Sequence, residues 1–323
     1  MSNYRSNSFF STIPAVTRNI LVINVIVWLA CFVFSRTGID LSNLIGLHYP
    51  LTKGFYLFQF ITYMFTHVDL THLFFNMFAL FMFGGALEHT WGPKRYLTYY
   101  MITGIGAALV QLLVCYFRIH ALMNSLPAEM VQVVHHEGYD LLQKGMNYTD
   151  PTMGSLNLLL HSVTIGASGA VFGLLLAFGI LFPNTPLYLM FIPIPIKAKY
   201  FVIGYGLIEL FLGVSNQTGD NVAHFAHLGG MVFGWLLILY WTKNDFPHSR
   251  NWLKNKIKHW FSDKKKQNNH LRSGYQRFES EYEYNRKKNE LIDEIDRILD
   301  KLKKSGYSSL TDEEKKKLFD YRK

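Results

Sequence analysis

Apolar residues occur in six long runs along the first 242 residues, with shorter or more polar segments between them. The runs cover residues 19–35, 69–87, 94–117, 168–183, 199–214 and 222–242. A helix needs about 20 mainly apolar residues to cross the hydrocarbon core of a bilayer. The pattern therefore predicts an all-α, polytopic membrane protein with a six-transmembrane-helix bundle. The fourth and fifth runs are short, so we expect neighbouring residues to continue those helices or the bilayer to thin locally.

The composition agrees with an embedded front and a polar tail. Half of the 323 residues are hydrophobic, whereas 17% are charged. Residues 1–241 contain ten Lys or Arg and nine Asp or Glu, but residues 242–323 contain 22 and 14. The formal net charge of +9 therefore lies almost entirely in the tail. A soluble protein with buried helices is a poor explanation of this pattern.

The polar segments divide the chain into four parts. We expect a cytoplasmic N-terminal tail at residues 1–17, the six-span core at 18–242, a basic juxtamembrane linker at 243–284 and a helical pair at 285–323. Within the core, residues 118–160 form a long loop whose apolar spacing predicts helical structure on the outer face of the membrane. The linker interleaves aromatic residues with lysines, which favours an anionic membrane surface over nucleic acid as its partner.

The helical pair carries local signals of its own. Gly306 is a helix-ending residue, and Thr311 with Glu314 forms a capping box. One apolar stripe consists of Leu291, Ile295, Ile298 and Leu302. The pair contains no recognisable chemistry, so we interpret it as a small folded appendage.

The distribution of Lys and Arg predicts the orientation in the membrane. With six spans, both termini share one side with the loops after spans two and four. That side is rich in basic residues: Arg5, Arg18, Lys94, Arg95, Lys197, Lys199 and the stretch 243–266. The opposite loops dilute their few basic residues with Asp and Glu. Both termini are therefore predicted to be cytoplasmic, and the first run, which no small-residue cleavage site follows, is expected to stay as an anchor.

Polar side chains inside spans are costly, so each is a functional candidate. They are His67, His72 and Asn76 around the start of span two, Glu209 in span five, and His224 and His227 in span six. Ser168 opens span four. Spans two, four and six all enter from the non-cytoplasmic side, which places Ser168, His227 and the pair His72 and Asn76 within about 10 Å of one another in depth.

A serine becomes a nucleophile when a base takes its proton, and histidine is the usual base. Gly169 and Gly173 in span four, with Gly230 and Gly234 in span six, form two small-xxx-small faces that would let these spans approach closely. We therefore predict that Ser168 meets a histidine of span six.

Two histidines of span six are candidates for that base. Glycines follow His227, whereas His224 lies nearer the surface, where water competes for hydrogen bonds. His227 is the predicted base and His224 a supporting or access residue. Asn76, His72 and the backbone N–H of Ser168 are expected to donate to an oxyanion.

Other chemistries fit less well. Four histidines, His67, His72, His224 and His227, resemble a metal site only weakly because no carboxylate or thiolate accompanies them, and we expect neither a metal nor a cofactor. Glu209 suits a proton relay in a transporter, but no inverted repeat accompanies it. A structural glutamate that is hydrogen-bonded within the bundle is the preferred reading.

Three motifs together resemble the rhomboid family of intramembrane serine proteases. They are HxxxxHLFFN at 67–76, GASGAVFG at 166–173 and AHLGGMVFG at 226–234, and the resemblance covers residues 18–241. It implies that Ser168 is the nucleophile and His227 the base of a Ser–His dyad, with His72 and Asn76 at the oxyanion hole. It further implies supporting roles for Gly166 and His67, and for Glu88 as the anchor of a structural turn in GGALEHTWG.

The resemblance also implies a partner and a location. The substrates would be membrane proteins, single-span or polytopic, cleaved within or near a spanning helix in a bacterial inner membrane. The tail is similar to an appendage of rhomboids from the Bacteroidetes. A catalytically inactive family member that binds membrane proteins is the alternative, although such members usually lack the serine or the histidine.

The sequence departs from the family in three places. The Trp-Arg pair of the first outer loop is missing, and position 172 is Phe where Tyr is frequent, so we expect only ring packing on His227 there. The loop at 118–160 is an insertion. We also expect no third carboxylate to orient His227.

Overall fold

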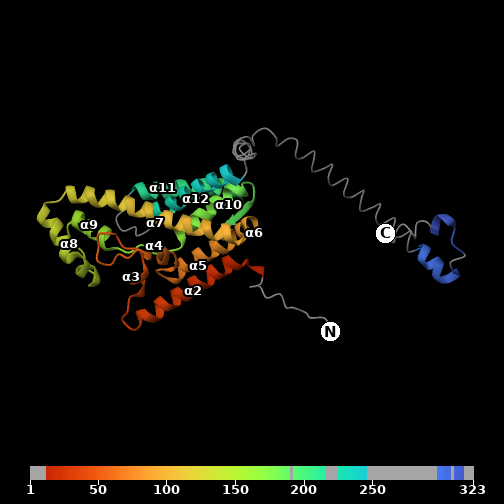
Figure 1. Ribbon diagram of the computed structural model, residues 1–323, viewed down its shortest axis with the longest axis horizontal. Coiled ribbons are helices and arrows are strands. Elements are labelled where there is room, and N and C mark those ends of the chain that lie inside the picture. Colours follow the sequence, from red (N-terminus) through yellow and green to blue (C-terminus); the bar gives the residue numbers. More distant parts are fainter. Residues whose placement is uncertain (1–11, 190–191, 216–223, 246–296, 307–308, 316–323) are drawn as a thin grey trace. The chain divides into compact units, whose positions relative to one another are not determined.

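The computed structural model describes residues 12–189, 192–215, 224–245, 297–306 and 309–315. The chain divides into two compact units, Met1–Leu253 and Lys254–Lys323. The first unit is a helical bundle that continues at one end into shorter helices (Figure 1).

The helical segments of this unit are given in chain order. They are α2 (Ala15–Ser35), α3 (Leu41–Ile45), α4 (Gln59–Thr62), the 3₁₀ turn η1 (Tyr63–Phe65), α5 (Leu70–Ala79), the π-helical segment η2 (Leu80–Gly84), α6 (Gly85–Trp91), α7 (Pro93–Asn124), α8 (Ala128–Gln143), α9 (Pro151–His161), α10 (Ser168–Leu181), α11 (Ala198–Ser215) and α12 (His224–Asp245).

Within the described residues, five helices are long and apolar enough to cross a membrane, namely Ala15–Ser35, Leu70–Trp91, Pro93–Asn124, Ala198–Ser215 and His224–Lys243. The remaining predicted span, the fourth, corresponds to α10, which has 14 residues. The predicted all-α polytopic membrane bundle is confirmed. The protein is therefore an integral membrane protein.

Helix α10 is not continued by its neighbours, so that part of the prediction is wrong. It begins at Ser168 and ends at Leu181, and most of its side chains are buried. In Figure 1 it lies against α7 and α12, and its contacts agree. A helix surrounded by protein does not have to match the bilayer thickness with its own length, because its neighbours shield its ends from lipid.

A two-stranded antiparallel sheet joins α10 to α11. The sequence pattern did not predict this sheet. Strand β1 (Pro186–Leu189) pairs with β2 (Ile192–Lys197) in a register that places Leu187 opposite Ile196. Alternating Ile and Pro in β2 disfavour a helix because proline lacks the backbone N–H that helices require.

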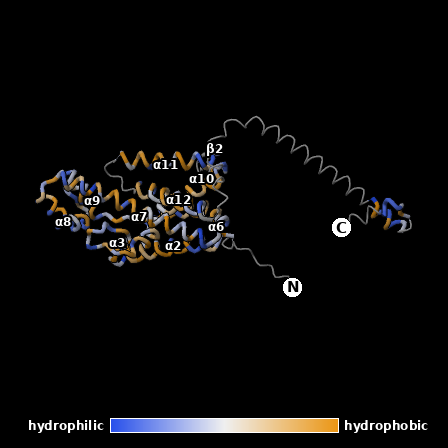
Figure 2. Tube along the Cα trace, turned by 45° about the horizontal axis from the view of Figure 1, so that its top comes forward, coloured by the Kyte–Doolittle hydropathy of each residue, from blue (hydrophilic) through white to orange (hydrophobic). Residues whose placement is uncertain are grey.

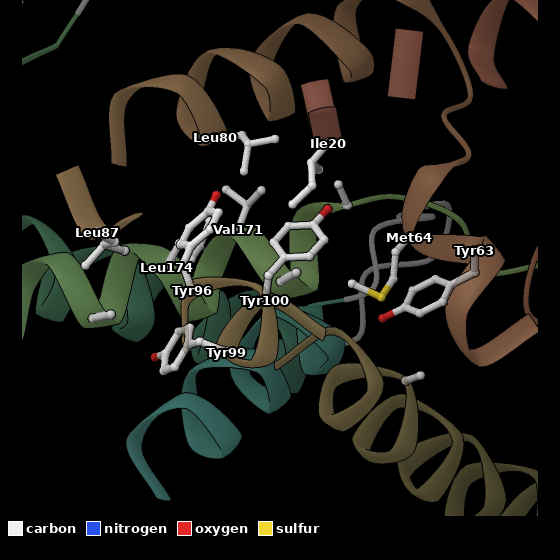
Figure 3. Close-up of a cluster of buried hydrophobic side chains, with 14 of the residues drawn as sticks. Ile20, Tyr63, Met64, Leu80, Leu87, Tyr96, Tyr99, Tyr100, Val171 and Leu174 are labelled. Atoms are coloured by element: carbon white, nitrogen blue, oxygen red, sulfur yellow. The ribbon is translucent and has the colours of Figure 1, made fainter. Parts of the chain in front are cut away.

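Aromatic residues of α7 form the centre of the bundle. Tyr96, Tyr99 and Tyr100 are fully buried, and Figure 3 shows their rings among apolar side chains that include Val171 and Leu174 of α10. The Tyr99 hydroxyl donates to the Gly173 carbonyl at 2.9 Å. This bond ties α7 to α10, and it also satisfies the buried hydroxyl.

The outward faces of the long helices remain apolar. Exposed side chains on α11 include Leu207, Phe211 and Val214, which are 62%, 71% and 69% exposed. Figure 2 shows α11 as predominantly hydrophobic. Apolar surface of this extent suits contact with lipid acyl chains.

Glu88 in α6 holds the N-terminus of α2. Its carboxylate accepts hydrogen bonds from the backbone N–H groups of Val16 and Thr17 at 2.9 and 2.7 Å, and from the Thr17 hydroxyl at 2.8 Å. A carboxylate at a helix N-terminus satisfies N–H groups without partners and complements the helix dipole. These contacts agree with the anchor role expected for Glu88.

The loop predicted to be helical contains α8, α9 and the end of α7. The segment between α2 and α4, residues 36–58, is called the first loop. Val134, Leu156 and Ile119 of the helices named above share a buried cluster with Tyr49 of this first loop. Asn43 of that loop also donates a 3.2 Å hydrogen bond to the Tyr139 hydroxyl. The helical prediction is confirmed, and the segment packs on the first loop; its position on the membrane surface stays a prediction.

The tail unit shows the predicted local signals. Residues 297–305 are helical, and Gly306 follows with a φ of 77°. The Thr311 N–H donates to Glu314 at 2.7 Å and the Glu314 N–H donates to the Thr311 hydroxyl at 3.3 Å, which confirms the capping box. Ile298 is buried, whereas Leu291 and Ile295 lie outside the described residues.

Helices α10 and α12 approach each other closely at Gly230. A Cβ atom at that position would collide with the Gly169 carbonyl oxygen. The predicted contact between the two helices therefore exists at this pair. Gly173 and Gly234 instead face α7, where a Cβ atom would meet Thr103 and Tyr99 respectively. Gly169 also faces α7, because a Cβ atom there would meet Ala107 first, although its carbonyl oxygen contacts Gly230. The prediction that all four glycines line the interface of α10 with α12 is therefore wrong for Gly173 and Gly234, and it holds for Gly169 only through its backbone.

We predict that Gly230→Ala separates α10 from α12 and destabilises the protein by about 1–3 kcal/mol, as expected for overpacking. The matched control is Gly204→Ala in α11, where no atom lies within 4 Å of the added methyl group. Thermal unfolding of the purified proteins in detergent measures both. Equal midpoints for the two variants would contradict the close approach.

Candidate active site

The segment that leads into α10 is held in place before Ser168 begins the helix. Thr164 and Leu47 exchange backbone hydrogen bonds of 2.9 Å in both directions, and the Gly166 N–H donates to the Tyr63 carbonyl at 2.9 Å. Gly166 has a φ of 132°, a conformation that glycine adopts without a steric penalty. Ser168 is thus presented at a helix N-terminus by a loop with a defined path.

The hydroxyl of Ser168 lies in hydrogen-bonding contact with the predicted base. Its Oγ atom is 2.8 Å from Nε2 of His227 on α12. The close approach at Gly230, one turn after His227, makes this contact between two helices possible. A hydroxyl and an imidazole at this distance are able to exchange a proton.

The imidazole of His227 is also held by an aromatic ring. Phe172, one turn after Ser168, stacks on it with ring centroids 4.2 Å apart and an interplanar angle of 3°. The predicted ring packing is therefore confirmed. Stacking restricts rotation of the imidazole and keeps Nε2 directed at the serine.

A carboxylate contacts the other ring nitrogen of His227. The expectation that no third carboxylate would orient this histidine was therefore wrong. Oε2 of Glu209, on α11, lies 2.8 Å from Nδ1 of His227. Glu209 is only 4% exposed. The two residues are 18 positions apart in the sequence, and the packing of α11 against α12 brings them together, so the sequence pattern did not indicate this contact.

His224 shares this carboxylate. Its Nδ1 atom is 2.7 Å from the same Oε2 atom of Glu209. The His224 and His227 rings, three residues apart on one face of α12, are 6.3 Å apart and perpendicular. The structure therefore places His224 beside His227 and against Glu209.

His72 approaches from helix α5. A Cβ atom built on Gly166 would lie 2.9 Å from Cε1 of His72 and 3.6 Å from Oγ of Ser168. The imidazole and the serine hydroxyl thus border the same small space. Asp69 caps α5 by accepting from the His72 N–H at 2.7 Å, which determines where this helix begins.

Asn76 and His67 flank His72. The Asn76 side chain is buried and donates one N–H to the His72 carbonyl at 2.9 Å. The ring of His67 packs against that of His72, with centroids 5.0 Å apart. Burial, followed by the neighbouring His72, lowers the pKa of His67 to about 3, so its imidazole is neutral.

The residues that lie close enough together to bind a metal are not the four histidines that the sequence suggested. Among the described residues, Glu209, His224 and His227 have donor atoms within 4.8 Å of one another. The carboxylate oxygen, however, already contacts both nitrogens at hydrogen-bond distance.

Gln59 is a structural residue that sequence reasoning missed. It is fully buried, and its amide donates to the carbonyls of Leu44 and Gly54 at 3.1 and 2.8 Å while accepting from the His48 and Tyr56 N–H groups. It thereby organises the first loop. A lone amide within the apolar stretch GFYLFQFITYMF was the available signal.

Comparison with known proteins identifies the family. Residues 54–121 and 139–244, more than half of the chain, match the Rhomboid domain. Residues 280–323, which include the helical pair, match a family of unknown function, DUF6576.

Individual relatives agree with this match. RHOMBOID-like protein 12, mitochondrial, of Arabidopsis thaliana is 30% identical over 172 residues, which are 53% of this chain and 42% of the relative. Rhomboid protease AarA of Providencia stuartii is 29% identical over 237 residues, 69% of this chain and 71% of the relative. Rhomboid protein 1, mitochondrial, of Saccharomyces cerevisiae is 26% identical over 55% of this chain and 40% of the relative. The chain thus spans less than half the length of the plant and yeast proteins.

Proposed function

Because the chain belongs to the rhomboid family, we propose that it is an intramembrane serine endopeptidase that cleaves spanning helices of other membrane proteins. The observation that carries the proposal is the 2.8 Å contact between Ser168 Oγ and His227 Nε2 at the start of α10. Packing alone does not require a hydroxyl and an imidazole to meet inside an apolar bundle, where polar groups are costly.

In the proposed reaction, Ser168 is the nucleophile and His227 the general base. His227 Nε2 takes the hydroxyl proton as Oγ attacks a substrate carbonyl carbon, and it then gives that proton to the leaving amine. Water repeats the two steps on the acyl-enzyme, which releases the new carboxyl terminus and restores the serine.

The developing oxyanion needs donors that are already in place. Three groups fit this role: the backbone N–H of Ser168 at the positive end of α10, the side chain of His72 and the amide of Asn76. The Asn76 amide has a second N–H besides the one that holds the His72 carbonyl. His72 lies beside Gly166 and so close to the serine hydroxyl.

The substrates follow from the location of this site. A helix offers no free carbonyl to a nucleophile, so a substrate must unwind locally, and helix-weakening residues near its outer end are expected. The charge pattern supports an orientation with both termini in the cytoplasm, in which α10 would begin toward the non-cytoplasmic side. The bacterial inner membrane proposed as its location follows from the resemblance to bacterial rhomboids.

The decisive test of the proposal uses Ser168→Ala. Wild-type protein in detergent should react with a fluorophosphonate probe at Ser168 and cleave a single-span model substrate, whereas the alanine variant should do neither. Its thermal unfolding should stay near wild type because only one hydroxyl is lost. Cleavage by the variant would refute the proposal; a wild-type protein that binds substrate without labelling or cleavage would favour the inactive-binder alternative.

A second prediction separates the two histidines of α12. His227→Ala should reduce cleavage to background and abolish probe labelling, because the base in contact with Ser168 is lost. His224→Ala should retain measurable turnover, because His224 contacts Glu209, whereas the 2.8 Å contact with the serine belongs to His227. Initial rates and labelling on matched preparations measure both, and the reverse pattern would make His224 the base.

A third prediction concerns the oxyanion donors. Asn76→Ala should lower kcat by about 10- to 1,000-fold, the range for loss of one such donor. Steady-state kinetics with a fluorogenic peptide-in-helix substrate measures the effect. An unchanged kcat would assign Asn76 only its hydrogen bond within α5.

A further inference from the structure

We propose that Glu209 is a positioning residue that orients His227, so that this protein works with a Ser168–His227–Glu209 triad and not with a dyad. The inference rests on the proposed function, since it assigns a role to a third group beside the serine and its base. Glu209 lies on α11, away from the three motifs that identify the family.

The hydrogen-bond geometry determines which nitrogen of His227 carries the proton. An ionised carboxylate only accepts hydrogen bonds, so Nδ1, 2.8 Å from Glu209 Oε2, must donate. A neutral imidazole has one N–H, and Nε2 therefore presents its lone pair to the Ser168 hydroxyl. Glu209 thus selects the tautomer that can act as base.

The position of the ring is determined from two directions. Phe172 stacks on the face of the imidazole with ring centroids 4.2 Å apart. Glu209 binds Nδ1 at the edge of the same ring. Rotation about the side chain of His227 would break the carboxylate bond, the stacking or both. The base is therefore held in place before a substrate arrives, which is the arrangement that lowers the cost of proton transfer.

His224 makes the buried carboxylate tolerable. Its Nδ1 lies 2.7 Å from the same oxygen, so Glu209 Oε2 is contacted by two imidazoles. A buried charge that is hydrogen-bonded on more than one side is far less costly than an unpaired one. His224 accordingly acts on the base through Glu209 and not on the substrate.

The same three atoms lie close enough together to raise the question of a metal ion. Separations of 2.7 and 2.8 Å between oxygen and nitrogen are those of charge-assisted hydrogen bonds. A metal at this place would also take the Nδ1 atom whose proton sets the tautomer. We therefore assign the cluster to hydrogen bonding.

During the reaction, the proton leaves Ser168 Oγ for His227 Nε2, and the imidazolium so formed lies against the carboxylate. Glu209 stays ionised throughout and exchanges no proton. Its negative charge stabilises the imidazolium more than the neutral ring, so its contribution appears in the rate of the chemical step and not in substrate binding.

The test compares Glu209→Gln with Glu88→Gln. Both glutamates are buried, at 4% and 5% exposure, and both accept several hydrogen bonds. Glu88, however, holds only the start of α2. Full-length protein in detergent is first labelled with a fluorophosphonate to completion, which gives the number of sites able to react. The labelling rate per reactive site, kcat and KM are then measured.

Glu209→Gln should lower kcat and the labelling rate per site together, by about 10- to 1,000-fold, as expected when general-base catalysis is impaired. The KM and the number of labelled sites should stay near wild type. Glu88→Gln should behave in the opposite way, with fewer labelled sites and lower thermal stability but an unchanged rate per site. A merely structural role of Glu209 would give the Glu88 pattern.

Failure of this inference is distinguishable from failure of the proposed function. If wild-type Ser168 is labelled and Glu209→Gln matches its rate per site, the triad is refuted and the protease stands. If wild-type Ser168 is not labelled, the proposed function itself fails. Should Glu209→Gln not accumulate as folded protein, Glu209→Asp keeps the charge but withdraws it by one methylene group, and an unchanged rate per site in that variant would likewise refute the triad.

Discussion

The close approach of α10 and α12 is the constraint on which the site depends. Gly230 lies so near the Gly169 carbonyl that no side chain fits between them. In a membrane, helices gain little from apolar contact with one another, and small residues allow the backbone proximity that drives their association. The Ser168–His227 contact depends on this approach, because the short serine side chain does not reach across a wider interface.

The burial of α10 explains how a 14-residue helix can serve in a membrane protein. Helix α7 supplies the tyrosines that fill the centre of the bundle, and the Tyr99 hydroxyl contacts the backbone of α10 at Gly173. Protein thus takes the place of lipid around the short helix. Its N-terminus can therefore lie within the molecule, where a loop held at Leu47 and Tyr63 brings the serine into place.

The polar groups at this level form one connected network across three helices. Hydrogen bonds link Ser168 to His227, His227 to Glu209, and Glu209 to His224. Each member satisfies the next, which is how buried polar groups avoid the penalty of lost hydration. Stability and the arrangement proposed for catalysis consequently rest on the same contacts.

Much of this was determined by the sequence alone. Hydrophobic runs indicated the spans, because the bilayer imposes length and apolarity on each helix locally, and the parity of the spans put Ser168, His72 and His227 at one level. The capping box of the tail and the stacking of Phe172 were also readable, since each depends on residues near one another in the chain or in a motif. The tertiary structure decided the partners of side chains: that Gly173 and Gly234 face α7, that Gln59 organises the first loop, and that Glu209 reaches His227. These contacts join helices whose relative rotation is set by packing, and the rotation of a helix about its axis leaves no trace in hydrophobic periodicity when the helix is apolar on all sides.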